Sequence, residues 1–182
     1  MASGFSYAQL KAALWARRGA RVHALIDGRI VPGLPALIAA ADCAGWDCLQ
    51  RGALSAPAAR EAAYLVELVE PAPFTDWVLG EATRSFPGWG LQLGSMQPLL
   101  AMREHCRGLG DVLMPDGRRR PWRWYDPQLL ATLLPELLPS QQDEVFGAGQ
   151  QIVLPSSAAW TWLAMEQGVL AREDRPLLRA AA

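Results

Sequence analysis

The chain has 182 residues, of which 51% are hydrophobic and 19% are charged. This composition excludes an intrinsically disordered chain and fits one packed domain, with at most an added lobe. The 17 basic and 18 acidic residues leave a formal net charge of −1. A broad electrostatic attraction to nucleic acid or to anionic lipid is therefore not expected.

The ends and the cysteines indicate a cytoplasmic protein. No secretory signal is visible, because Lys11, Arg17 and Arg18 interrupt the first apolar stretch. The longest apolar stretch, 30–41, contains two prolines and is too short to span a bilayer, so we expect no membrane span. The cysteines have neither a disulfide framework nor a metal-ligand spacing, so we expect free thiols and no metal. They are Cys43, Cys48 and Cys106. No phosphate-binding loop or dinucleotide fingerprint is present, so we expect no cofactor.

Hydrophobic periodicity and turn residues predict alternating helices and strands in the first part of the chain. The predicted helices are 6–18, 32–44 and 74–85, and the predicted strands are 21–26, 46–49, 63–69 and 89–94. Residues 55–60 are predicted as a connection. In the last of these strands, Trp89, Leu91 and Leu93 should share one face.

The second part of the chain begins with a predicted helix over 99–109, followed by a hairpin around 112–125. After residue 126 the pattern favours helices over 129–134, 140–146 and 160–170, with a short strand at 152–154. The predicted fold class is α/β (α+β). We expect a mixed sheet with flanking helices in an α/β lobe over 1–126, and a smaller, mainly helical lobe over 127–182, forming one compact unit.

Signatures of enzymatic chemistry are few. His105 and Cys106 are neighbours, but adjacent residues on a helix point about 100° apart, so a core cysteine beside a flanking histidine is the simpler interpretation. Glu81 falls on the apolar stripe of the 74–85 helix, where a buried carboxylate would serve as an acid or base, although an exposed position or an ion pair explains it equally well. A small cytoplasmic enzyme using these three residues is the alternative hypothesis.

The densest basic cluster lies beside tryptophans. Arginines next to aromatic residues bind single-stranded nucleic acid, but Asp111, Asp116 and Asp126 flank this cluster, and an arginine-protected hairpin edge is an alternative. Tryptophan and arginine are also the residue types most enriched at protein interfaces, while burial within the chain would equally explain the tryptophans. The candidate partner-binding residues are Arg119, Arg120, Trp122, Trp124, Trp160 and Trp162.

An ordered series of motifs resembles a known family. Its most specific elements are a Pro-Asp-Gly-Arg turn at 115–118 and an Arg-x-Tyr-Asp-Pro segment at 123–127. With the segments 25–28, 64–68 and 89–95 upstream, this series is similar to the DUF4123 family, adaptor chaperones of bacterial type VI secretion, over about 22–154. The chain departs from the family where Ala62 and Ala63 replace the usual proline before the Tyr-Leu strand.

The resemblance implies a non-enzymatic adaptor that binds a toxic effector protein in the cytoplasm and helps load it onto the VgrG spike. Nucleic acid is not an expected partner. The matched motif is expected to be mainly architectural: Arg123 pairs with Asp27 or Asp126, and the Tyr125 hydroxyl reaches a polar partner at the lobe junction. Asp126, directly before Pro127, is expected to cap the following helix.

Overall fold

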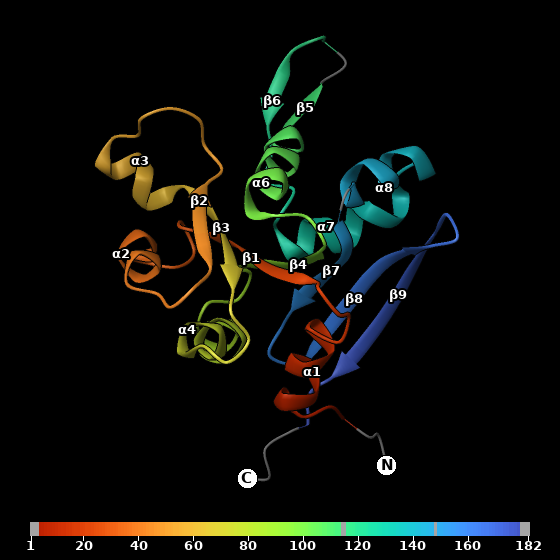
Figure 1. Cartoon of the computed structure of the whole chain (residues 1–182). Coiled ribbons are helices and arrows are strands. Elements are labelled where there is room, and N and C mark those ends of the chain that lie inside the picture. Colours follow the sequence, from red (N-terminus) through yellow and green to blue (C-terminus); the bar gives the residue numbers. More distant parts are fainter. Residues whose placement is uncertain (1–3, 114–115, 148, 179–182) are drawn as a thin grey trace.

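A seven-stranded sheet forms the centre of the computed structural model, which describes residues 4–113, 116–147 and 149–178. The strand order is β2-β3-β1-β4-β7-β8-β9, and every strand pair in these ranges runs antiparallel. The prediction of a mixed sheet is therefore wrong, whereas helices packed on an antiparallel sheet agree with an α+β fold. Figure 1 shows the sheet with helices on both of its sides.

The elements of the described residues follow in chain order. The strands of the main sheet are β1 (Arg21–Asp27), β2 (Gly45–Cys48), β3 (Ala63–Leu68), β4 (Gly90–Ser95), β7 (Gly149–Pro155), β8 (Ala159–Glu166) and β9 (Val169–Pro176). The helical segments are α1 (Tyr7–Leu14), α2 (Leu34–Ala39), α3 (Ala56–Glu61), α4 (Pro73–Asp76), η1 (Trp77–Ala82), α5 (Thr83–Ser85), α6 (Leu99–Gly108), α7 (Pro127–Leu133), η2 (Leu134–Glu136) and α8 (Pro139–Phe146). A separate two-stranded sheet joins β5 (Asp111–Leu113) to β6 (Arg119–Pro121).

The sheet separates two apolar cores. Side chains of α1, α2 and η1 pack on one face in the first core, whereas α6, α7 and α8 cover the other face in the second core (Figure 1). Because both faces are covered, β3 and β4 are buried along their whole length. Successive residues of β1 illustrate the division, since Ala24 and Ile26 belong to the first core and Leu25 to the second.

Local sequence signals explain several boundaries. Ser6 begins α1 with a capping box, in which its hydroxyl accepts from the Gln9 backbone N–H and the Gln9 side chain accepts from the Ser6 N–H. The predicted helix over 32–44 is shorter, at Leu34–Ala39. The predicted connection over 55–60 contains the helix α3, whose first turn is capped by the Ser55 hydroxyl.

The strand predicted over 89–94 exists, but its first residue differs from the expected pattern. Trp89 packs in the first core, whereas Leu91 and Leu93 pack in the second, so the prediction that the three share a face is wrong. Gly90 between them has φ +147°, and a Cβ there would lie 1.8 Å from the Leu25 carbonyl oxygen. The close approach of β1 therefore requires glycine, and the backbone turns Trp89 to the opposite side.

The part of the chain after residue 126 is less helical than predicted. Helices are present in 127–146, but 149–176 form three strands that extend the same sheet as β1 and β4. The predicted helix over 160–170 is wrong, because these residues form β8, a two-residue turn and the start of β9. Gln167 and Gly168 in that turn have φ +53° and +78°, values typical of the tight turn that joins antiparallel strands.

The hairpin after α6 is present with a shifted second strand. Its strands pair Asp111–Leu113 with Arg119–Pro121, so the second strand ends where the predicted one, 121–125, begins. Two residues of the predicted turn region, 114–115, lie outside the described residues.

Candidate functional site

A buried carboxylate at the end of β1 organises the motif residues. Asp27 is the last residue of β1, and its side chain is only 1% exposed. One of its oxygens, Oδ1, accepts from the backbone N–H of Arg29 at 2.9 Å and lies 3.3 Å from the Arg29 Nε. The other, Oδ2, pairs with the Arg123 guanidinium. Of the two expected partners, Asp27 is therefore the one that holds Arg123, and it links the segment after β6 to β1.

Tyr125 and Asp126 continue this motif. The half-buried Tyr125 has a hydroxyl that interacts with Arg29, and burial together with the nearby Asp27 charge raises the pKa of that hydroxyl. The Asp126 carboxylate accepts from the backbone N–H groups of Gln128 at 3.0 Å and Leu129 at 3.2 Å, which is the helix cap that the sequence predicts for α7. The motif therefore joins β1 to the start of α7.

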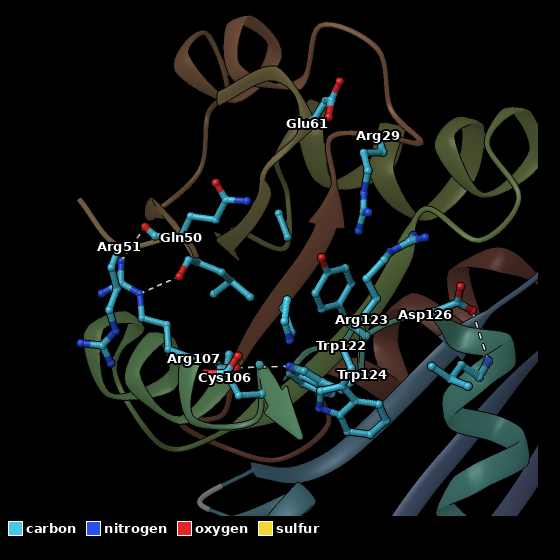
Figure 2. A pocket seen from close by; sticks show the side chains of 17 residues that line it. Arg29, Gln50, Arg51, Glu61, Cys106, Arg107, Trp122, Arg123, Trp124 and Asp126 are labelled. Atoms are coloured by element: carbon cyan, nitrogen blue, oxygen red, sulfur yellow. Dashed lines mark hydrogen bonds between the residues drawn. The ribbon is translucent and has the colours of Figure 1, made fainter. Parts of the chain in front are cut away.

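A cleft of about 890 Å³ opens beside this motif, on the sheet face that carries α6. Figure 2 shows Arg29 and Arg123 at one side of the cleft, Arg51 and Arg107 at the other, and Trp122 between them. Apolar surface comes from Leu49, Ala63, Tyr125 and Leu129. The cleft therefore combines aromatic and aliphatic surface with guanidinium groups on opposite walls.

The second arginine pair holds α6 against the end of β2. The Arg107 side chain donates hydrogen bonds to the carbonyls of Leu49 at 3.0 Å and Cys48 at 2.8 Å. Its guanidinium also pairs with Glu104, which accepts from Arg51 at 3.2 Å. Each wall of the cleft thus has one carboxylate shared between two of the lining arginines.

The predicted partner-binding residues divide into two groups. Arg119 and Arg120 are exposed, and Trp122 is half-buried at the cleft. Trp124, Trp160 and Trp162 are 1%, 0% and 8% exposed, which agrees with the alternative that these tryptophans are buried within the chain. Buried indoles contribute to the stability of the chain and are not available to a partner in this conformation.

These tryptophans have clear packing roles instead. Trp122 and Trp124 donate their indole N–H groups to the carbonyls of Leu109 and Cys106, and so attach the segment after β6 to the end of α6. Trp160 and Trp162 stack with ring centroids 5.8 Å apart in the first core. Their spacing of two residues places both on the same face of β8. This spacing indicates a strand, and the prediction of a helix over 160–170 did not take it into account.

The three candidate enzymatic groups do not converge. Exposed Glu81 belongs to η1, which packs on the first core, whereas Cys106 is fully buried in the second core across the sheet. Burial raises the pKa of the Cys106 thiol to about 12, which disfavours the nucleophilic thiolate. The His105 Nε2 lies 3.0 Å from the Val145 carbonyl oxygen in α8. Because a carbonyl oxygen only accepts, Nε2 bears the proton and donates the hydrogen bond.

The described ranges contain no group of three histidine, cysteine, aspartate or glutamate side chains placed to hold a metal ion. All three cysteines are free thiols. In the described residues, no helix is both long and apolar enough to cross a membrane.

Comparison with protein families identifies the relationship. A family model described as a domain of unknown function, DUF4123, matches residues 22–144, which is more than half of the chain. The chain belongs to the DUF4123 family. The match contains all but the first residue of β1, the cleft and the whole of the motif from Asp27 to Pro127, and it ends ten residues before the expected limit at 154. No curated protein and no solved structure gives a significant match.

The sequence predicts some residues of one cleft wall, as an architectural motif, but not Arg29 beside them and none of the arginines of the other wall. Arg123, Tyr125 and Asp126 were singled out through their motif, and Asp27 through the resemblance. Arg51 and Arg107 were missed, because they come from the end of β2 and from α6, and only the packing of α6 on the sheet brings them to the cleft.

Proposed function

We propose that this chain is an adaptor chaperone of type VI secretion. In the cytoplasm of the producing bacterium it binds a toxic effector protein and helps load that effector onto the VgrG spike. The observation that carries this proposal is membership of the DUF4123 family, since the matched range contains the Pro-Asp-Gly-Arg turn and the Arg-x-Tyr-Asp-Pro segment on which the resemblance rests.

The geometry supports a binding role over a catalytic one. The open cleft offers arginines and aromatic rings, which are enriched where proteins bind other proteins. The enzymatic alternative requires at least two of Glu81, His105 and Cys106 to converge in a pocket, and the sheet separates Glu81 from Cys106. Cys106 borders the cleft, but it is 0% exposed and burial raises the pKa of its thiol to about 12, which disfavours a nucleophilic thiolate.

The motif residues contribute to this role indirectly. Asp27, Arg123 and Asp126 hold β1, the segment after β6 and α7 in fixed relative positions, and thereby shape the cleft wall. A rigid, preformed surface loses less conformational entropy when it binds a partner. Substitutions in the motif should therefore reduce the stability of the chain first, and effector binding as a consequence.

A pull-down of the tagged full-length chain from its own host, followed by mass spectrometry, tests the proposal. We expect enrichment of one toxin encoded beside the chain and near a spike gene, together with the spike protein. A host strain carrying the tag alone is the control. Enrichment of metabolic enzymes or RNA alone would contradict an adaptor role.

A further inference from the structure

Three consecutive arginines lie on a hairpin that stands apart from the main sheet. Figure 1 shows β5 and β6 extending beyond α6, away from the seven strands. Arg118, Arg119 and Arg120 are exposed on this hairpin. In the described part of the chain, none of the three guanidinium groups has a carboxylate within salt-bridge distance. None of the three is therefore neutralised by a paired carboxylate of the described residues, although Asp111 and Asp116 lie on the same hairpin.

The arginine-bearing strand leads directly into the cleft. Pro121 ends β6 and lines the cleft, and Trp122 follows with its ring in the cleft wall and its N–H bonded to α6. One edge of β6 pairs with β5, and it has no strand partner on its other edge in the described residues. An extended segment can therefore follow β6 and continue to the cleft without a change of direction.

The charges of the hairpin and the cleft differ. In the cleft, the lining arginines share Asp27 and Glu104, and Glu61 and Asp111 add negative charge at the rim. The cleft is thus close to electrically balanced and has apolar surface at Trp122, whereas the positive surplus lies on the hairpin. A matching ligand carries its negative charge on the hairpin side and an apolar group on the cleft side.

We propose that an extended acidic segment of a partner polypeptide binds along β6, with aspartate or glutamate side chains on Arg119 and Arg120 and an aromatic or aliphatic side chain in the cleft. This inference rests on the proposed adaptor function and specifies the segment of the effector that the chain recognises. Arginine pairs with carboxylates through two parallel hydrogen bonds, which provides specificity as well as affinity.

A polypeptide fits this surface better than a nucleic acid. Asp111 and Asp116 flank the arginines, and Glu61 lies at the cleft rim, so a continuous phosphate backbone would meet negative charge at both ends of the hairpin. The formal net charge of −1 also disfavours the sequence-independent attraction on which nucleic-acid binding depends. A peptide places its few carboxylates selectively and avoids this repulsion.

The test uses the full chain and a displayed library of random short peptides. We expect selection to enrich sequences with several aspartate or glutamate residues followed by an aromatic or aliphatic residue. The affinity of an enriched peptide, measured by fluorescence anisotropy, should fall when salt increases. Enrichment of neutral or basic peptides, an absence of enrichment, or tighter binding of a single-stranded oligonucleotide than of the peptide would overturn the proposal.

Charge-reversal variants locate the binding surface. The double variant Arg119→Glu and Arg120→Glu should weaken binding of the enriched peptide by about tenfold or more, because it replaces attraction with repulsion. The matched control, Arg18→Glu and Arg84→Glu, reverses two exposed arginines near α1 and in α5, at the face opposite α6, and should leave the affinity unchanged. Replacing Arg119 and Arg120 with lysine keeps the positive charge but loses the two parallel hydrogen bonds, so the loss of affinity should be smaller than in the glutamate variant.

Equal losses in the two glutamate variants would contradict this location, since they would indicate an effect of net charge alone. Circular dichroism establishes that each variant is folded; the four arginines are exposed, so none should unfold the chain. The peptide test does not use the host, so its outcome is separate from that of the pull-down that tests the adaptor function. An effector that copurifies with the chain and binds the hairpin variant normally would overturn this inference and leave the adaptor function standing.

Discussion

At the scale of single residues, Asp27 stabilises the site because one buried carboxylate satisfies two arginines. Removing its charge leaves the Arg29 and Arg123 guanidinium groups without a carboxylate partner, and both are only partly exposed to solvent that would compensate them. We expect Asp27→Asn to lower the free energy of unfolding by about 3 kcal/mol, measured by urea denaturation. Asp174→Asn, which removes an exposed carboxylate on β9, should change it by less than about 0.5 kcal/mol. Similar values for the two variants would contradict this role of Asp27.

His23 gives the chain a pH-dependent stability. Burial disfavours the imidazolium more than neighbouring Glu67 favours it, and Arg21 adds repulsion, so the pKa of His23 falls from 6.5 to about 4. Between these values the unfolded chain binds a proton that the folded chain does not, and stability decreases as pH falls through that window. The contribution of His23 to this loss is about 3 kcal/mol.

The variant His23→Gln checks this contribution, because it is neutral at every pH. Urea denaturation of both proteins at about pH 7 and about pH 4 should show a smaller loss of stability in the variant. An equal loss in both proteins would show that other groups cause the acid sensitivity.

At the scale of elements, the start of α7 depends on the Asp126 cap. The carboxylate accepts from two backbone N–H groups that the helix itself leaves unpaired. Asp126→Ala should therefore lower the free energy of unfolding by about 1 kcal/mol and reduce the melting temperature. Asp143→Ala, at an exposed position of α8, is the control and should have little effect. Unchanged stability with lost effector binding would instead make Asp126 a contact residue.

The β8–β9 hairpin is an element whose tryptophans serve the core. Trp160 is fully buried, stacks on Trp162 and meets the Tyr7 ring edge-on at 6.5 Å. Trp160→Ala should lower the free energy of unfolding by about 3–5 kcal/mol, measured by thermal or urea denaturation. Trp46→Ala, at a side chain 42% exposed on β2, should cost much less. Comparable losses would contradict the distinction between core and surface tryptophans.

At the scale of the whole molecule, the sequence predicted the central elements better than the last ones. β1, β3 and β4 were predictable because short apolar runs end at turn residues. The β8–β9 hairpin was missed, since its leucine, methionine, glutamate and arginine residues also favour helices, and its Gln167–Gly168 turn is a weak hairpin signal. For the site, the Asp126 cap follows from local sequence, but the Arg51–Arg107 wall depends on tertiary packing that periodicity does not contain.

The proposed function is delivery of another polypeptide to the secretion spike. Purifying tagged VgrG from host strains that contain or lack this chain, and quantifying the effector bound to the spike, tests this function. We expect the effector to be present on the spike in the first strain and strongly depleted in the second, with recovery when the chain is restored. Equal amounts of spike-bound effector in both strains would contradict it.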